Sequence, residues 1–247
     1  MFLPEQRDIY DVFRPMPGAI AVTEAIGIYN FVKQFYKATE GIAADLGSHG
    51  GKSSMFAALA LYEMGYKENF NMVDLLYDGD NPAWADSHYG NFESAYGAAG
   101  QWAQGGLINP DFPENWRKRV GLFCGDRVKI SGRSSLQFIS EHDLFCYIFI
   151  DTDDHDPELV MSEAKALENK VSPGGIALFH DYKNQFTGVL KAVEYLGSTG
   201  KYEIIEMDWA PIKKYVKEND LEAKNNSWQA FKGDSYPTFV GGVRRNA

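Results

Sequence analysis

Acidic and imidazole side chains stand at the ends of two apolar runs in the sequence. Asp151 closes the run 144–151, and His180, followed by Asp181, closes the run 175–180. Parallel strands present their carboxyl ends on one edge of a sheet, so these side chains are expected to meet there. Carboxylates are preferred Mg²⁺ ligands, and a bound ion would lower the pKa of a hydroxyl and orient it. The sequence therefore predicts a metal site at Asp151, His180 and Asp181. Alternatively, His180 bonds a neighbouring loop and contacts no ligand.

A cluster of charged residues that includes a histidine follows the first of these runs. Asp153, Asp154, His155 and Asp156 precede Pro157. An imidazole that titrates near neutrality suits proton removal from a hydroxyl, so His155 is the predicted general base. The cluster also fits an ordinary helix N-terminus, where proline is favoured and carboxylates are stabilised by the helix dipole. The sequence leaves both interpretations open.

A glycine-rich segment, Asp45–Ser54, leaves an apolar run and enters an amphipathic one. Glycines let the backbone approach a ligand, and a helix start offers unpaired N–H groups, so we expect it to bind something polar. A P-loop needs four residues between its first Gly and the Gly-Lys pair, whereas three separate Gly47 from Gly51-Lys52. This spacing disfavours a P-loop, although the strand ending in Asp151 could hold Mg²⁺ in such a hydrolase.

The spacing Asp45-x-Gly47-x-x-x-Gly51 resembles the first motif of class I S-adenosylmethionine-dependent methyltransferases. Two later segments, Tyr147–Pro157 and Ser172–Tyr182, resemble a branch that reads apolar strand, Asp-Gly-Asp-His, helix, Leu-x-Pro-Gly-Gly, apolar strand, His-Asp. That branch includes metal-dependent O-methyltransferases acting on sugars or phenolic hydroxyls. The resemblance extends over about residues 15 to 210.

The chain departs from this branch at two places. Thr152 replaces the motif's Gly, and one extra residue precedes His155, so either Asp153 or Asp154 corresponds to the second Asp. The run 75–77, Leu-Leu-Tyr, replaces the usual Thr-Trp after the second strand. These departures affect the substrate side of the expected site more than the cofactor side.

The resemblance implies S-adenosylmethionine as methyl donor and assigns residues to hold it. Asp74 corresponds to the acid that accepts from the two ribose hydroxyls, with Asp78 as the alternative and a turn-forming carboxylate as the plainer interpretation. Gly132–Ser135 resembles the adenine-side loop, or is an ordinary serine-rich turn. The implied cofactor-binding residues are Asp45, Gly47, Ser48, Gly51, Asp74, Arg133, Ser134 and Asp151.

Apolar runs alternate with amphipathic segments along the chain, which indicates β-α units feeding a parallel sheet. The expected strands are 41–46, 70–74, 127–131, 144–151, 175–180, 202–207 and 238–243. The expected helices are 22–37, 53–64, 157–168 and 187–196, with helical turns around 92–104 and 114–123 and an exposed charged helix within 213–226. Pro157 fits a first helical position, and Pro173-Gly174 is expected to turn the chain into the fifth strand.

The composition fits one α/β domain, with 247 residues of which 45% are hydrophobic and 23% charged. A formal charge of -10 would repel nucleic-acid phosphates. Cys124 and Cys146 have apolar neighbours and are interpreted as free core thiols of a reducing compartment. The N-terminus lacks the apolar core of a signal peptide, and no run approaches the roughly 20 apolar residues of a spanning helix. We expect a cytoplasmic protein with no nucleic-acid or membrane partner.

Together these features predict an α/β, Rossmann-like methyltransferase fold: a seven-stranded sheet with its last strand antiparallel and helices on both faces. Residues 1–38 are expected to form an N-terminal helical cap and residues 39–247 the methyltransferase domain. The predicted function is O-methylation of a small hydroxylated molecule, with Mg²⁺ assisting. The alternatives are a P-loop-like nucleotide hydrolase and a non-catalytic cofactor-binding protein. Open questions are the acceptor, whether the chain forms a homo-oligomer, and whether residues 78–113 close over a ligand or form an aromatic-packed insertion.

Overall fold

The computed structural model describes residues 1–5, 8–13, 20–37, 39–75, 112–152, 156–182, 187–221 and 241–246. Their strands form one seven-stranded sheet in the order β3-β2-β1-β4-β5-β7-β6. The strands are β1 (Ile42–Leu46), β2 (Phe70–Val73), β3 (Val128–Ser131), β4 (Phe145–Ile150), β5 (Val171–Phe179), β6 (Tyr202–Ile205) and β7 (Gly241–Arg245). The pairings from β3 to β5 are parallel, whereas β7 runs antiparallel to β5 and β6. The predicted fold class is confirmed.

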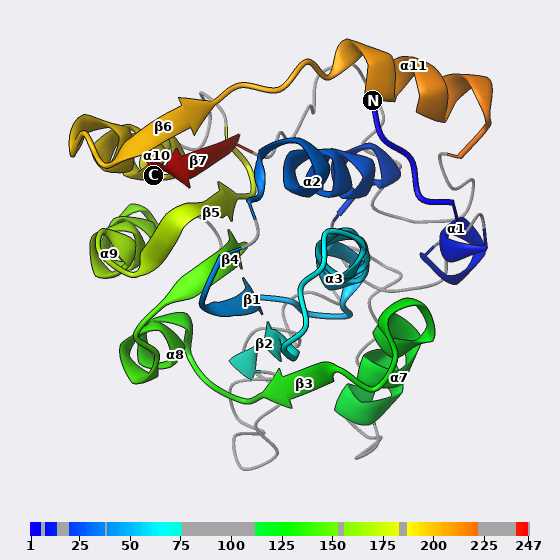
Figure 1. The fold of residues 1–247 in the computed structure, drawn as a ribbon, viewed down its shortest axis with the longest axis horizontal. Coiled ribbons are helices and arrows are strands. Elements are labelled where there is room, and N and C mark those ends of the chain that lie inside the picture. Colours follow the sequence, from blue (N-terminus) through cyan, green and yellow to red (C-terminus); the bar gives the residue numbers. More distant parts are fainter. Residues whose placement is uncertain are drawn as a thin grey trace, which may run out of the picture.

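Helices cover both faces of this sheet (Figure 1). One face carries α1 (Ile9–Phe13), α2 (Val22–Phe35), α3 (Lys52–Glu63) and α7 (Phe112–Cys124), which share one apolar core. The other face carries α8 (Ser135–Glu141), α9 (Pro157–Leu167) and α10 (Thr187–Ser198), which share a second core. The last described helix, α11 (Ala210–Glu218), packs against α2. The sheet therefore lies between two hydrophobic layers, as its apolar central strands require.

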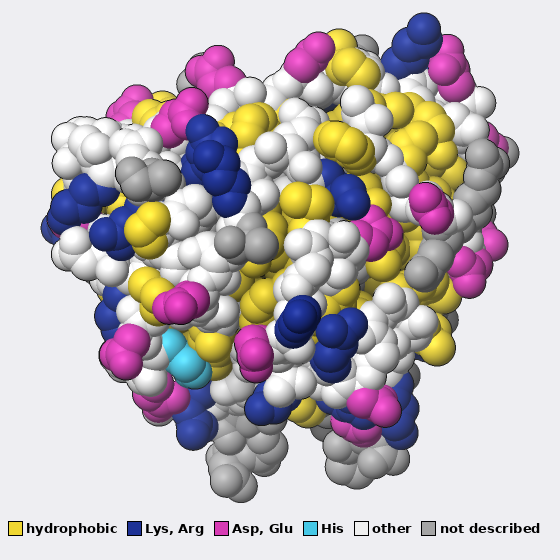
Figure 2. Space-filling view, in the orientation of Figure 1, with side chains coloured by type: hydrophobic (Ala, Val, Ile, Leu, Met, Phe, Trp, Pro, Cys, Tyr) yellow, Lys and Arg dark blue, Asp and Glu magenta, His cyan; other side chains and the backbone are white. Residues whose placement is uncertain are grey.

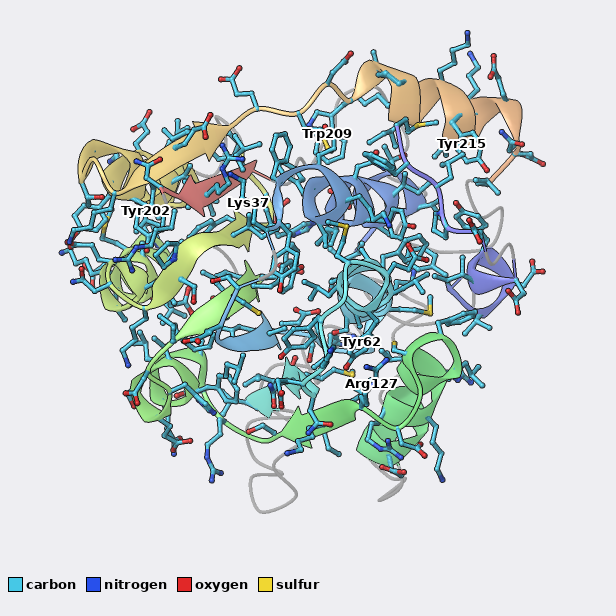
Figure 3. All side chains as sticks on the ribbon, viewed as in Figure 1. Lys37, Tyr62, Arg127, Tyr202, Trp209 and Tyr215 are labelled. Carbon is cyan, nitrogen blue, oxygen red and sulfur yellow. The ribbon has the colours of Figure 1, made fainter. Side chains whose placement is uncertain are left out.

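Two contacts fix the helices on the α2 and α3 side (Figure 3). The guanidinium carbon of Arg127, just before β3, lies 3.8 Å from the centre of the Tyr62 ring on α3. Trp209 lies against α2, where a Cβ at Gly27 would come within 2.3 Å of its ring. Because α2 and α3 also pack on each other, the N-terminal segment shares the core of the sheet domain. The division of the chain at residue 38 stays a prediction.

The start of β5 differs from expectation. The strand begins at Val171, so Pro173 and Gly174 lie inside it and do not form a turn before it. The register explains how: Phe145 pairs with Val171, and then Tyr147 pairs with Ile176, which leaves extra residues on β5. Gly174 has a φ of +80°, and proline lacks an N–H for the ladder, so both residues suit a bulge.

Helix α8 was not predicted, because the segment after β3 was interpreted only as a serine-rich loop. Its seven residues bury just Ser135, Phe138 and Ile139, too few to establish a helical period. Ser134 is the N-cap residue, and its hydroxyl accepts the main-chain N–H of Gln137 at 3.3 Å.

Several expected elements fall partly or wholly outside the described residues. The expected helical turns at 92–104 and nearly all of the stretch 78–113 lie outside them. Strand β7 overlaps the expected strand 238–243, of which residues 238–240 are outside. The charged helix expected within 213–226 corresponds to α11, which starts three residues earlier, at Ala210.

Candidate active site

The ends of β4 and β5 bring together the side chains that the sequence predicted there. His180 Nδ1 lies 3.0 Å from Asp151 Oδ1 and 3.0 Å from Asp181 Oδ2. The adjacency follows from strand pairing, because Ile150 pairs with Phe179 and the His180 N–H donates to the carbonyl of Ile150 at 2.9 Å. The predicted meeting of these three residues at one sheet edge is what the structure shows.

A buried carboxylate that the sequence analysis missed completes this cluster. Glu24 of α2 is 2% exposed, and its Oε1 lies 3.3 Å from His180 Nε2. Its other oxygen accepts the main-chain N–H of Ala21 at 2.8 Å. The available signal was a lone acid in an otherwise apolar helical face, since Val22, Ala25 and Ile26 are buried around it. The cluster thus draws on α2 as well as on the sheet.

The charges in this cluster are strongly unbalanced. Burial alone would lower the pKa of His180, but the carboxylates of Asp151 and Glu24, with Asp181 beside them, hold it well above its ordinary value. Even with the ring protonated, three carboxylates surround a single positive charge. Such a buried excess of negative charge favours a bound cation.

The donor set fits a divalent cation. The ligand atoms of Asp151, His180 and Asp181 all lie within 4.8 Å of one another. The two 3.0 Å distances from His180 Nδ1 place these nitrogen and oxygen atoms close enough together to share one cation. That nitrogen is buried and forms no well-aligned hydrogen bond with the carboxylates that face it. These three residues could therefore hold a metal ion.

The glycine loop after β1 lies directly against this cluster. Gly47 has a φ of +78°, and a Cβ there would come within 1.8 Å of the carbonyl oxygen of Asp151. The N–H of Asp151 in turn donates to the carbonyl of Leu46 at 2.9 Å. Gly47 is thus required by the approach of the loop to β4, and the loop and the cluster form one continuous site.

Most of the amides in the loop itself already have protein partners. The amides of Gly47 and Ser48 both donate to the carbonyl of Val73, and that of Gly51 donates to the Ser48 carbonyl. The His49 amide donates to Asp74 Oδ2 at 2.8 Å. These bonds tie the loop to the end of β2. The first turn of α3, whose amides have no helical acceptor, is the remaining source of donors.

Asp45 lies beneath the loop and is fully buried. Its Oδ2 accepts the hydroxyls of Ser53 and Ser54 at 2.6 and 2.5 Å. Burial raises the pKa of Asp45 to about 7, partly opposed by the two hydroxyls and assisted by the negative charges of Asp151 and Asp74. The carboxyl therefore fastens β1 to the start of α3. Its role in holding a cofactor stays a prediction.

The other predicted cofactor residues occupy the same edge of the sheet, farther from the cluster. Asp74 follows β2, and Arg133 and Ser134 follow β3. Arg133 forms an ion pair with Glu141 at 3.5 Å, and Ser134 caps α8. The assignment of Arg133 and Ser134 to the adenine side stays a prediction.

The predicted general base, His155, lies outside the described residues, together with Asp153, Asp154 and Asp78. Asp156 is described, and its carboxylate accepts the N–H of Glu158 at 2.9 Å as the N-cap of α9. Pro157 occupies the first turn of that helix, as predicted. The helix-start interpretation therefore holds for Asp156.

Lys52, the first residue of α3, is buried beside the cluster. Its Nζ lies 4.7 Å from the centre of the Phe13 ring, and the residue is 2% exposed. Burial lowers the pKa of Lys52 to about 8, against the raising effect of the Glu24 charge. In a P-loop this lysine would bind phosphates, whereas here it contacts an aromatic ring of α1.

Comparisons with known proteins agree with this architecture. Residues 44–182, more than half of the chain, match a family model described as a methyltransferase domain. No curated protein sequence matches the chain.

Solved structures show the same fold at low identity. The O-methyltransferase TomG of Streptomyces achromogenes, involved in tomaymycin synthesis and solved with S-adenosylmethionine, is 11% identical, with a TM-score of 0.55 over 100% of this chain and 93% of that one. An O-methyltransferase of Bacillus cereus, solved with S-adenosylhomocysteine, is 15% identical, with a TM-score of 0.52 over 99% of this chain and 93% of that one. The chain belongs to the methyltransferase-domain family and is a class I S-adenosylmethionine-dependent methyltransferase.

Proposed function

We propose that this protein transfers a methyl group from S-adenosylmethionine to a hydroxyl of a small molecule, assisted by a divalent cation. The observation that carries the proposal is the convergence of Asp151, His180 and Asp181 beside the glycine loop. That arrangement corresponds to the metal-dependent O-methyltransferase branch that the Tyr147–Pro157 and Ser172–Tyr182 segments resemble.

The cofactor is proposed to lie along the carboxyl edge of β1, β2, β3 and β4. Support comes from the family match and from two structural neighbours, solved with S-adenosylmethionine and S-adenosylhomocysteine. Parallel strands place the loops after them on one edge, where a nucleoside can extend across several loops. The residues proposed to hold it are Asp45, Gly47, Ser48, Gly51, Asp74, Arg133, Ser134 and Asp151.

The cation is proposed to be held by Asp151, His180 and Asp181. Mg²⁺ suits the two carboxylates, and Mn²⁺ is also accommodated because the third ligand is an imidazole nitrogen. A cation held by these three residues would lower the pKa of the acceptor hydroxyl and orient it.

The remaining chemistry belongs to the protein and its two substrates. The acceptor oxygen attacks the methyl carbon in line with the breaking carbon–sulfur bond, whose electron pair stays on sulfur, so the sulfonium becomes a neutral thioether. The hydroxyl proton leaves for a base, and His155 is proposed for that role. The sheet edge supplies alignment of the two reactants, which accounts for a large part of the rate of such displacements.

The nucleotide-hydrolase alternative loses its main support. Lys52, which would bind the phosphates of a P-loop, is packed over Phe13 and nearly excluded from solvent. The strand order and the family match both correspond to a methyltransferase.

A small-molecule acceptor agrees with the face of the protein that Figure 2 draws. Figure 2 shows basic side chains of the described residues interspersed with acidic ones on this face, a distribution unlike the basic stripe that nucleic-acid binding needs. Among the helices that the structure describes, none combines the length and the apolar character needed to cross a membrane.

The direct test is a methyl-transfer assay. S-adenosylhomocysteine formation is followed with Mg²⁺ and a panel of acceptors that includes catechols, simple phenols and free sugars. The proposal predicts turnover with at least one hydroxylated acceptor and loss of turnover in Asp181→Asn. Glu63→Gln, which alters a carboxylate at the end of α3 that contacts Tyr29 and Lys33 of α2, is the matched control and keeps its activity. Cofactor binding without transfer to any acceptor would instead indicate a non-catalytic member of the fold.

A further inference from the structure

Glu24 is the least expected member of the His180 cluster, because it comes from the N-terminal segment. It lies on α2, outside the residues 44–182 that match the family model. The residue is 2% exposed, so its carboxylate is withdrawn from water. A buried carboxylate is retained at high free-energy cost unless a partner compensates it.

The contacts of Glu24 indicate which partner compensates it. Oε2 accepts the Ala21 N–H and so fastens the carboxylate to the start of α2. Oε1 is left facing His180 Nε2 at 3.3 Å, an ion-pair distance at which the two atoms do not meet the geometry of a hydrogen bond. No Lys or Arg of the described residues forms an ion pair with Glu24 within 4.0 Å. The His180 ring is therefore the cationic or proton-donating group that this carboxylate contacts directly.

The two nitrogens of the His180 ring face different carboxylates. Nε2 faces Glu24, and Nδ1 faces both Asp151 Oδ1 and Asp181 Oδ2 at 3.0 Å. A neutral imidazole binds a metal through one nitrogen and carries its proton on the other. A carboxylate that accepts that proton fixes the tautomer and the orientation of the ring and strengthens the metal ligand.

We propose that Glu24 is a positioning residue of the metal site: it accepts the Nε2–H of His180, so that Nδ1 points at Asp151 and Asp181 as a cation ligand. This inference rests on the proposed function, since it presupposes the cation. It gives the N-terminal helix α2 a part in the site that the matched family segment alone does not contain.

The test measures Mn²⁺ binding by the full chain, with electron paramagnetic resonance of the free ion and calorimetry as two readouts. Glu24→Gln removes the charge and offers an amide in place of a proton acceptor. We expect Mn²⁺ binding to weaken about 10- to 100-fold, as for loss of other carboxylate partners of metal-ligating histidines. Glu63→Gln is the control. The Glu63 carboxylate, at the end of α3, contacts Tyr29 and Lys33 of α2, the helix that carries Glu24, but does not contact His180. This variant should bind Mn²⁺ with an affinity within about twofold of the wild type.

A double-mutant cycle separates positioning from a general loosening of α2. If Glu24 acts through the ring, then Glu24→Gln has no further effect on Mn²⁺ affinity in a His180→Ala background. Additive effects of the two substitutions would overturn the inference. If Glu24→Gln does not fold, Glu24→Asp, which keeps the charge but shortens the side chain, is measured in its place and must also weaken binding.

The outcomes also separate this inference from the proposed function. If the wild type binds Mn²⁺ and Glu24→Gln binds it with equal affinity, the proposed role of Glu24 is overturned and the metal site is not. No Mn²⁺ binding by the wild type overturns the metal site itself, and the role of Glu24 with it.

Discussion

Gly47 packs so closely on the main chain of Asp151 that a Cβ at position 47 would come within 1.8 Å of the Asp151 carbonyl oxygen. This contact joins the loop after β1 to the end of β4, and so joins the proposed cofactor loop to the proposed metal ligand. The positive φ of Gly47, +78°, is a second reason for glycine at this position.

Replacing Gly47 by alanine should therefore lower the stability of the fold by much more than the strain of a positive φ alone. Gly65→Ala is the matched control, because its φ of +92° is similar but nothing lies within 4 Å of the added Cβ. We expect Gly65→Ala to destabilise the fold by about 1–2 kcal/mol. Gly47→Ala should exceed about 3 kcal/mol or fail to fold, since backbone atoms must move.

Urea unfolding of both variants checks this prediction. Equal losses of stability in Gly47→Ala and Gly65→Ala would show that the loop can retreat from Asp151 at little cost, and would contradict a rigid link between the loop and the cluster.

Stability should depend on pH through Asp45. The pKa of its carboxyl rises from 3.8 in the unfolded chain to about 7 in the folded protein, chiefly by burial. A raised folded pKa means that the contribution to stability is fully present below about pH 4 and is lost as the pH rises towards 7. Asp45→Asn stays neutral and keeps an oxygen for Ser53 and Ser54, so it should be more stable than the wild type at pH 8 by about 2–4 kcal/mol.

The measurement is urea unfolding at pH 5 and pH 8. The difference in unfolding free energy between Asp45→Asn and the wild type should grow from pH 5 to pH 8. Asp143→Asn, a substitution of an exposed carboxylate, should show no such growth. An advantage that is the same at both pH values would contradict the burial of an ionisable Asp45.

The sheet edge was predictable from the sequence because it depends on strand ends. Asp151 and His180-Asp181 each follow an apolar run, and parallel pairing brings such ends together whatever the details of the loops. The same alternation of apolar and amphipathic segments predicted a seven-stranded, mainly parallel sheet with its last strand antiparallel, and an N-terminal helical segment was predicted as well.

Glu24 was not predictable in this way, because its meeting with His180 spans more than 150 residues and depends on how α2 lies across the sheet. Helix α8 was missed for a different reason, since two apolar side chains, Phe138 and Ile139, do not establish a period. The partners of the loop amides were not predictable either, because Val73 and Asp74 belong to the neighbouring strand end. The contact of Glu24 with His180 and the partners of the loop amides are tertiary contacts, which a local sequence pattern does not encode.

Activity should depend on a divalent cation. Excess EDTA is expected to abolish transfer by the wild type, and Mg²⁺ added beyond the chelator should restore it. In Asp181→Asn the same addition should restore little, because one of the two proposed anionic ligands is lost. Formation of S-adenosylhomocysteine is the readout, and undiminished turnover in chelator would remove the metal from the proposed function.

Lys52 should destabilise the folded protein, so replacing it with an apolar residue should increase stability. Burial lowers the pKa of its ammonium from 10.5 to about 8, so the folded state is penalised for this charge most fully below pH 8. Lys52→Met keeps the length of the side chain and its contact with Phe13 while removing the charge. We expect Lys52→Met to be about 1–2 kcal/mol more stable than the wild type at pH 7, after allowing for the lost cation–π contact.

Chemical denaturation between pH 7 and pH 10 tests this expectation. The advantage of Lys52→Met should shrink as the pH rises above 8, because the wild-type lysine then becomes neutral in the folded state. A variant less stable than the wild type at pH 7 would mean that the ammonium has a compensating partner.

Calorimetric titration of the wild-type chain with S-adenosylhomocysteine tests the central claim most directly. A protein that holds the nucleoside product of methyl transfer along this sheet edge should bind it with one-to-one stoichiometry and a dissociation constant in the micromolar range or below. Absence of heat and of saturation up to high micromolar ligand would contradict the assignment of the β1 loop, and of the edge beside it, to a methyl donor.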